Sequence, residues 1–273
     1  MTDFHIHDQK YHSLLDMLRS YGGVLLAFSG GVDSSFLLKA MQQAGVKTLA
    51  VTAVSETMPL QDRDDAEHLA RELGIEHVII HTAELDKEDF ARNAQDRCFH
   101  CKNELFGRLA EMAAQRGLPV VCDGSNSDDL SDFRPGRRAA EAHGVQSPLA
   151  DCGLTKDEIR MLSQCLGLTT WNKPSSPCLS SRFPYGTRIT AAGIERVRKA
   201  EDILRSIGLR VLRVRDHGDT ARIEIGPEEM ALVMEGQNRS LVVDRLRSLG
   251  YSFITLDLEG YRTGSLNRGL RET

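Results

Sequence analysis

The chain has 273 residues, a net charge of -5 and a hydrophobic content of 41%. This length fits one large domain or two small ones, with a core that needs no disulfides. Because the net charge is negative, the protein as a whole has no positive electrostatic field that would attract nucleic acid. No run of residues is long and apolar enough to span a membrane. Because the polar N-terminus is unlike a signal peptide, we expect a cytoplasmic protein whose six cysteines are reduced thiols or metal ligands.

Helical and strand patterns alternate through the first half of the chain. In chain order, the pattern predicts a helix at 11–21, a strand at 23–28, a helix at 34–44, a strand at 48–54, a helix at 60–73, a strand at 77–81, a helix at 98–116 and a strand at 120–122. Four alternations with short connections are typical of an α/β fold with a doubly wound parallel sheet. The polar stretch 127–145 is expected to be irregular, and Thr155 and Glu158 predict a capping box on a helix at 155–166.

The composition changes at residues 172–177, where prolines and serines interrupt regular structure. In chain order, the remaining elements are expected to be a helix at 190–207, strands at 209–215 and 220–225, helices at 227–234 and 240–249, and a strand at 252–256. Residues 216–219 connect the first two strands as a hairpin. We therefore predict two domains, a nucleotide-binding domain at 1–173 and a smaller α+β domain at 174–273.

A glycine-rich loop, residues 29–34, lies between the first predicted strand and the following helix. Gly30 and Gly31 can take positive φ angles, and their amides can form a nest for an anion beside the helix N-terminus, which itself favours phosphate. Three serines add hydroxyl donors: Ser29, Ser34 and Ser35. Asp33 is unusual in a phosphate cradle unless it holds a magnesium ion. The plainer alternative is a tight strand-to-helix turn with a serine cap.

This loop resembles the PP-loop of the ATP pyrophosphatase family. The resemblance implies an adenine nucleotide alpha hydrolase-like, Rossmann-like fold and an enzyme that transfers AMP from ATP to an acceptor oxygen, releasing pyrophosphate. It further implies that the loop binds the pyrophosphate end of ATP and that Asp33 acts in catalysis with magnesium. The adenine is expected near Ala53 and Ser55, at the carboxyl end of the second strand.

Cysteines indicate a second kind of chemistry. Cys98 and Cys101 form a Cys-x-x-Cys pair, and Cys178 lies in an irregular, arginine-containing segment. Three cysteines from two segments can hold an iron–sulfur cluster with one open iron, and together with His100 they can instead bind zinc. The alternative for each cysteine is a small buried hydrophobe. We expect that plainer role for three of them: Cys122, Cys152 and Cys165.

The surroundings of Cys178 favour a reactive sulfur. A thiolate between the positive charges of Arg182 and Arg188 would be stabilised and would become a better nucleophile or metal ligand.

Several segments resemble the LarE family of ATP-dependent sulfur transferases, and the likeness extends through nearly the whole chain. They are residues 123–129, Arg134-Pro135-Gly136, residues 177–190 and residues 260–267. The resemblance implies that ATP activates a carboxylate of a pyridinium dicarboxylate mononucleotide, a precursor of a nickel-pincer cofactor. A cysteine-borne sulfur then displaces AMP.

Members of that family differ in their sulfur source. Some surrender the sulfur of a cysteine that matches Cys178, and others carry three cysteines that bind a [4Fe-4S] cluster. Because this chain has Cys98, Cys101 and Cys178, the resemblance implies the cluster version. It also implies a homo-oligomer.

Charged residues of the second predicted domain offer a binding site. Arg213 and Arg215 alternate on one face of a predicted strand, with Arg222 on its partner. Guanidinium groups suit bidentate capture of phosphate or carboxylate, and a solvated strand face is the alternative. The family resemblance favours Arg213 and Arg215 as contacts to the mononucleotide phosphate and Glu224 as a residue that orients a metal or an arginine. At 128–129, one of two aspartates is expected to face ATP or magnesium.

Two other functions stay open. Some tRNA thiolases also combine a PP-loop with three cluster cysteines, although the acidic charge and the lack of a basic arm argue against a nucleic-acid partner here. The second is a nucleotide- or metal-binding module without catalysis.

Overall fold

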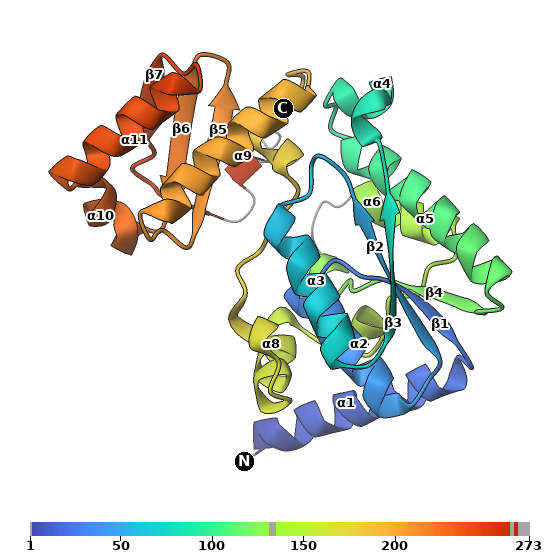
Figure 1. The fold of residues 1–273 in the computed structure, drawn as a ribbon. Helices are drawn as coiled ribbons and strands as arrows, with labels where there is room; N and C mark the ends of the chain where they lie inside the picture. Colours follow the sequence, from blue (N-terminus) through green and yellow to red (C-terminus); the bar gives the residue numbers. More distant parts are fainter. Residues whose placement is uncertain (1, 131–134, 263–264, 267–273) are drawn as a thin grey trace. The chain divides into compact units, whose positions relative to one another are not determined.

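A computed structural model describes residues 2–130, 135–262, 265 and 266. The chain forms two compact units (Figure 1). The first comprises the chain up to Glu84 together with Gln95–Ser176, and the second comprises Leu85–Ala94 together with the chain from Pro177 onward. Whether independent folding domains divide between residues 173 and 174 stays a prediction.

A parallel sheet forms the centre of the first unit, which confirms the predicted fold class. Its strand order is β3-β2-β1-β4. The strands are β1 (Val24–Ala27), β2 (Thr48–Val54), β3 (Glu76–His81) and β4 (Val120–Cys122). Val24 pairs in parallel with Thr48 on one side and with Val120 on the other. The carboxyl ends of β1, β2 and β4 therefore meet at one edge, where ligands bind in open α/β sheets.

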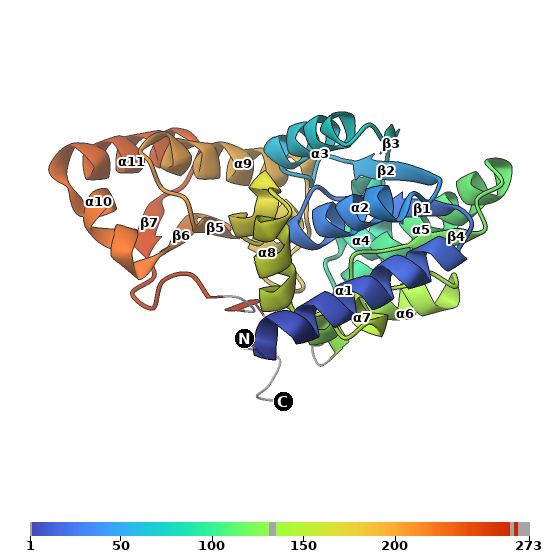
Figure 2. The ribbon, with the colours of Figure 1, turned by 90° about the horizontal axis from the view of Figure 1, so that it is seen from below.

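Helices cover both faces of this sheet because its strands are apolar on both sides. Leu26 packs in one core cluster, with helices α1 (Thr2–Ser20), α2 (Val32–Ala44), α3 (Leu60–Glu72), α7 (Pro148–Asp151) and α8 (Lys156–Cys165). Its neighbour Leu25 points the opposite way and packs with α5 (Arg97–Gln115) and α6 (Pro135–Ala142). Figures 1 and 2 show these two helical layers on either side of the strands.

Local signals in this unit are confirmed in part. Thr155 and Glu158 form the predicted capping box. The expectation that residues 127–145 are irregular is wrong, because α6 lies within them. Its two buried alanines, Ala139 and Ala140, pack against α5, and two small side chains give too weak a periodicity to identify a helix. Arg134, one residue of the family-like segments, lies outside the described residues, as do Thr263, Gly264 and Asn267.

A three-stranded sheet with helices on one face forms the second unit. The strands are β5 (Leu212–His217), β6 (Thr220–Ile225) and β7 (Phe253–Leu256), in the order β5-β6-β7. The predicted hairpin is confirmed, because His217 pairs with Thr220 in antiparallel β5 and β6. Side chains of α9 (Ala191–Ser206), α10 (Met230–Met234) and α11 (Gly236–Ser248) pack with Val214 and Ile223.

Short helical segments complete the described chain. They are α4 (Glu88–Ala91) and the 3-10 turns η1 (Glu84–Asp86), η2 (Ser127–Leu130), η3 (Thr169–Asn172), η4 (Leu179–Arg182) and η5 (Pro227–Glu229). Within the described residues, no helix combines the length and the apolar character needed to cross a membrane.

Candidate functional site

The glycine-rich loop connects β1 to α2 at the carboxyl edge of the first sheet. Gly30 has a φ of +67°, a left-handed conformation that favours glycine, whereas Gly31 has an ordinary φ of -79°. A Cβ atom on Gly30 would lie 2.9 Å from the backbone oxygen of Asp62. Gly30 is therefore needed for both its backbone angle and its close packing, and the expectation of a positive φ at Gly31 is wrong.

Polar side chains of the loop face one another. The Ser29 and Ser34 hydroxyl oxygens lie 3.1 Å apart, and the Ser34 hydroxyl donates to the Gly31 carbonyl oxygen. Ser35 is fully buried, and its hydroxyl oxygen has no hydrogen-bond partner among the described residues. The loop therefore holds a pair of contacting hydroxyls and one unused donor at the N-terminus of α2.

Asp33 has one occupied and one open carboxylate oxygen. Lys156 donates to Oδ2 over 2.6 Å. Oδ1 is buried and has no hydrogen-bond partner within the part of the chain that the structure describes. A buried carboxylate oxygen without a partner is costly unless something binds it. Because oxygen is the ligand atom that Mg²⁺ prefers, Asp33 fits a magnesium site.

Other expected nucleotide contacts lie at the ends of the neighbouring strands. Ala53 is on β2 and Ser55 follows it, with the Ser55 hydroxyl oxygen 3.0 Å from that of Thr57. After β4, Gly124 packs so closely on the loop helix that a Cβ atom there would lie 2.9 Å from the Ser34 amide nitrogen. The sheet thus places these groups on the same edge as the glycine-rich loop.

The carboxylates of the two expected acidic contacts bind backbone N–H groups. The Asp128 carboxylate accepts from the backbone N–H of Lys156, and the Asp129 carboxylate accepts from that of Asn126. These bonds fix the loop after β4. A role for either aspartate toward ATP or magnesium stays a prediction.

Cys98 and Cys101 lie on α5 in the first unit, separated by about one helical turn. Cys98 is exposed and Cys101 is half-buried, with its sulfur 3.9 Å from the Glu84 carboxylate. His100 lies 3.2 Å from Asp96. Among the residues that the structure describes, no group of three or more His, Cys, Asp or Glu side chains is arranged to hold a metal. The two cysteines supply a partial ligand set, so a cluster stays a proposal.

All six cysteines are free thiols, and their burial differs from expectation at two positions. Cys122 is buried, and burial raises the pKa of its thiol well above the usual range. Cys152 is half-buried. Cys165 is exposed, so its prediction as a buried hydrophobe is wrong. It ends α8, where a side chain is easily left outside the core.

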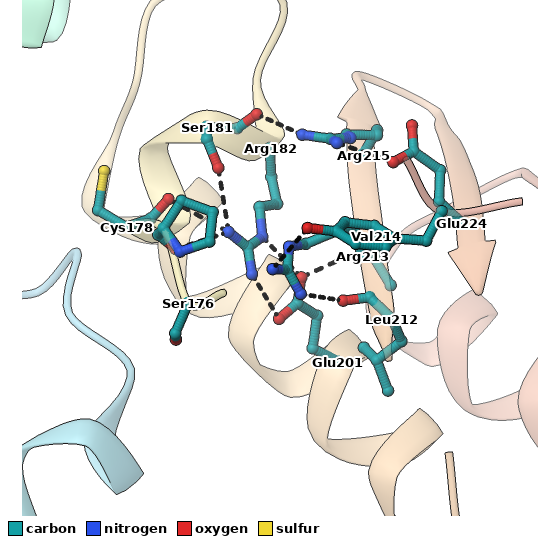
Figure 3. Close-up of polar contacts among 12 residues, drawn as sticks. Ser176, Cys178, Ser181, Arg182, Glu201, Leu212, Arg213, Val214, Arg215 and Glu224 are labelled. Carbon is teal, nitrogen blue, oxygen red and sulfur yellow. Dashed lines mark hydrogen bonds and ion pairs between the residues drawn. The ribbon is translucent and has the colours of Figure 1, made fainter. Parts of the chain in front are cut away.

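Cys178 lies in the second unit at the start of η4 and is half-buried. Arg182 donates to the backbone carbonyl oxygens of Pro177 and Cys178 over 2.8 and 3.3 Å. The sulfur of Cys178 points away from this guanidinium group (Figure 3). Arg182 therefore holds the backbone of the segment, and its charge faces Glu201, at 2.7 Å. Arg188 likewise pairs with a carboxylate, that of Glu88, at 2.6 Å.

A cavity of about 470 Å³ opens on the charged face of the second sheet. Residues that alternate with the core residues of β5 and β6 line it, together with neighbouring loops: Arg182, Arg215, His217, Arg222, Glu224 and Asp257. Glu224 is 1% exposed, and its two oxygens accept from Arg215 at 2.7 Å and from Arg222 at 2.9 Å. Burial alone would raise the pKa of Glu224, but these two arginines outweigh it and lower the pKa.

The two arginines expected to bind phosphate differ in position. Arg215 lines the cavity, and within the described residues its Nε has no hydrogen-bond acceptor. Arg213 is not among the described residues that line this cavity, and its guanidinium lies 4.8 Å from the centre of the Tyr261 ring. Burial, assisted by the charge of Arg182, lowers the pKa of Arg213. Arg215 therefore lies at the cavity wall with one buried donor that has no partner among the described residues, and Arg213 stacks on an aromatic ring.

Sequence reasoning missed three charged residues around the glycine-rich loop: Asp62, Lys156 and Lys173. Lys156 pairs with Asp33, while Lys173 contacts both Asp62 and the Gly30 carbonyl oxygen. A single charged residue within a helix or a linker carries no local signal of such a contact. The only indication in the sequence was that these three residues lie close to the ends of predicted helices or strands.

Comparison with known proteins shows what this chain is similar to. A family model described as asparagine synthase matches residues 10–133, which include the glycine-rich loop. An uncharacterized protein of Synechocystis sp. is 42% identical over 263 residues, covering 94% of this chain and 98% of its own length. The pyridinium-3,5-bisthiocarboxylic acid mononucleotide synthase of Lactiplantibacillus plantarum is 38% identical over 260 residues, covering 94% of each chain.

The chain belongs to the LarE family. It is thus an ATP-dependent sulfur transferase built on a PP-loop domain. A more distant relative of this LarE-type chain is the tRNA-specific 2-thiouridylase MnmA of Desulforamulus reducens, 27% identical over 196 residues, which cover 56% of this chain and 53% of that protein.

Proposed function

We propose that this LarE-type enzyme uses ATP to adenylate a carboxylate of a pyridinium dicarboxylate mononucleotide, releases pyrophosphate and then inserts sulfur. The observation that carries the proposal is the 38% identity, over 94% of both chains, to a pyridinium-3,5-bisthiocarboxylic acid mononucleotide synthase. Likeness over nearly the whole length includes both units, so it covers the nucleotide loop as well as the Cys178 segment.

The glycine-rich loop is proposed to bind the pyrophosphate end of ATP. Backbone N–H groups at the start of α2 and the serine hydroxyls would donate to phosphate oxygens. Magnesium, held by the open oxygen of Asp33, would neutralise charge on the departing pyrophosphate. Lys156 supplies a positive charge 2.6 Å from the same aspartate. The adenine is proposed to lie by Ala53 and Ser55.

The charged cavity of the second unit is proposed to bind the mononucleotide. Arg215 offers a free Nε donor, and Arg222 is partly exposed beside it. Arg222 also pairs with Asp257 at 3.6 Å, so a phosphate would be bound by the planar guanidinium donors and not by an excess of positive charge. Arg213 would support this site from beneath Tyr261. Both oxygens of Glu224 are paired with arginines. For Glu224 to orient a metal, the ion pair with Arg215 or the one with Arg222 must therefore break.

The sulfur source is proposed to involve Cys178 together with Cys98 and Cys101. A [4Fe-4S] cluster bound by three cysteines would supply an open iron able to carry an extra sulfide. The pair on one face of α5 suits this ligand set, and zinc remains the alternative for the same sulfurs. Anaerobic purification followed by iron, sulfide and absorption analysis decides between them. A colourless protein that holds zinc, or no metal after reconstitution, contradicts the cluster.

Sulfur transfer tests the function and the role of Cys178 directly. We expect wild-type enzyme, ATP, magnesium and the mononucleotide to yield pyrophosphate and a thiocarboxylate product. Cys178→Ala should abolish sulfur transfer and spare ATP binding, whereas Cys165→Ala, which removes an exposed thiol, should leave both unchanged. Retained transfer by Cys178→Ala would reject the assigned role.

The similarity to a tRNA-specific 2-thiouridylase suggests tRNA as an alternative sulfur acceptor. Tight, salt-sensitive tRNA binding would support it, since phosphate contacts weaken as salt rises. The net charge of -5 and the small-molecule relative favour the mononucleotide. A non-catalytic binding module would be supported if no pyridine carboxylate elicited pyrophosphate release. Cytoplasmic action and a homo-oligomeric state are also proposed, from the free thiols and the family resemblance.

A further inference from the structure

A cluster of charges, with Asp62 buried and Asp65 partly exposed, lies between the glycine-rich loop and the last residues of the first unit. Lys173 is 15% exposed, and its ammonium group donates to the Gly30 carbonyl oxygen at 3.1 Å and to Asp65 at 2.7 Å, and forms an ion pair with Asp62 at 2.9 Å. Two hydrogen bonds and one ion pair hold this ammonium group. This lysine is therefore fixed in one position.

The backbone of Lys173 is held as firmly as its side chain. Its N–H donates to the Thr170 carbonyl oxygen over 3.0 Å, and its carbonyl oxygen accepts from Arg160 over 2.9 Å. The backbone of Lys173 is thus bonded to α8 and η3, and its side chain is bonded to the glycine-rich loop. Lys173 therefore links these parts of the first unit.

Asp62 divides its two carboxylate oxygens between two partners. Oδ1 binds Lys173, and Oδ2 accepts from the Ser176 hydroxyl over 2.6 Å. Asp62 lies in the first turn of α3, and the backbone of that turn packs on Gly30, where a Cβ atom would lie 2.9 Å away. One carboxylate therefore connects the loop, through Lys173, to Ser176.

Cys178 follows Ser176 by two residues, which is a span of at most about 7 Å of extended chain. Fixing Ser176 therefore restricts the positions open to the Cys178 backbone. The stretch Lys173–Cys178 contains two prolines, Pro174 and Pro177, which stiffen it further.

We propose that Asp62 is a positioning residue that fastens the chain leading to Cys178 to the ATP loop. The inference rests on the proposed roles of the loop and of Cys178. Without this contact, the loop would lose one support for the Gly30 carbonyl oxygen, and the cysteine segment would lose one of its anchors in the first unit. Asp62 touches neither ATP nor sulfur in this proposal.

Binding and thiol accessibility test this inference separately from catalysis. The probes are the affinity for a non-hydrolysable ATP analogue with magnesium, and the rate of Cys178 alkylation by iodoacetamide, read by peptide mass spectrometry. Loss of the hydrogen bond from Ser176 to the Asp62 carboxylate should raise the fraction of molecules in which the Cys178 segment is detached from the first unit. The alkylation rate of Cys178 should therefore rise by about tenfold.

Three variants separate the two arms of the contact. Ser176→Ala should speed Cys178 alkylation and leave analogue affinity unchanged. Asp62→Asn should speed alkylation and also weaken the analogue, by about fivefold, since it disturbs Lys173. Asp64→Asn removes the same charge from an exposed position on α3 and should change neither.

Unchanged alkylation in folded Ser176→Ala would overturn the proposal, as would equal effects of Asp62→Asn and Asp64→Asn. Should Asp62→Asn fail to fold, Ser176→Ala alone decides. Both probes work on protein that transfers no sulfur, so a failure of the proposed function is seen separately, as wild-type enzyme without product.

Discussion

The Glu201 carboxylate neutralises Arg182 inside the second unit, and removing its charge should be strongly destabilising. Glu201 is fully buried and Arg182 is 1% exposed, with two bonds between them at 2.7 and 3.0 Å. Burial alone would raise the pKa of Glu201, but Arg182 outweighs it and lowers the pKa, so the carboxylate is ionised at neutral pH. Glu201→Gln keeps the shape and leaves a buried guanidinium without a counter-charge, at a cost of about 3–5 kcal/mol.

Arg205 provides a matched control because it binds the same carboxylate from outside. Its side chain is 39% exposed, and it lies 3.0 Å from Glu201 Oε2. Arg205→Gln removes a solvent-screened ion pair and should cost less than about 1 kcal/mol. The difference between the free energies of unfolding of Glu201→Gln and Arg205→Gln measures how much burial adds to the strength of the ion pair.

Urea unfolding followed by far-ultraviolet circular dichroism measures the decrease in the free energy of unfolding. Hydrogen exchange shows which elements are destabilised. Faster exchange in Glu201→Gln should be concentrated in α9, which carries Glu201, and in β5, where the Val214 N–H donates to it over 3.2 Å. Equal losses for Glu201→Gln and Arg205→Gln would refute the reasoning.

Three further predictions concern the first unit. Gly124→Ala places a methyl group 2.9 Å from the Ser34 amide nitrogen, so ATP affinity should fall about tenfold or more, measured by calorimetry. Thr155→Ala removes a helix cap and should cost about 1 kcal/mol in urea unfolding. Burial lowers the pKa of His77, which contacts Thr52. Stability should therefore be complete above the ordinary histidine pKa of about 6.5 and decline as pH falls below it, and His77→Gln should flatten that decline.

Two of these predictions have a control variant, and each has an outcome that would contradict it. Gly236→Ala, at a position where a Cβ atom meets nothing within 4 Å, should leave ATP affinity unchanged. An unaltered affinity in Gly124→Ala contradicts the contact. Undiminished stability in Thr155→Ala would mean that the cap is dispensable. His68→Gln, at an exposed position, should keep the full decline with pH, and an equal flattening by both histidine variants opposes the role of His77.

Local patterns predicted the features that depend on neighbouring residues. The alternation of apolar runs and helices identified the parallel sheet, and the Thr155 cap and the hairpin at residues 216–219 followed from turn chemistry. Gly30 was recognisable because a tight strand-to-helix turn beside a ligand needs glycine, and its left-handed φ agrees.

Features that depend on distant residues were beyond such patterns. Asp62 and Ser176 are 114 residues apart in the sequence, and nothing near either indicates the other. Likewise, the alternation of Arg213 and Arg215 places both on one strand face, but only the fold shows that Tyr261 lies over the first while the second lines the cavity. Exposed Cys165 illustrates the same limit, since burial is set by packing.

Mass spectrometry of a single reaction tests directly whether this enzyme inserts sulfur into a pyridinium dicarboxylate mononucleotide at the expense of ATP. Enzyme, ATP and magnesium are incubated with the mononucleotide, and both the small molecule and the Cys178 peptide are weighed. We predict that sulfur replaces a carboxylate oxygen, with one pyrophosphate released for each sulfur inserted. An unchanged Cys178 mass would indicate the cluster route, and loss of its sulfur the sacrificial one. A mononucleotide that keeps its oxygen atoms while wild-type enzyme binds ATP would contradict the account.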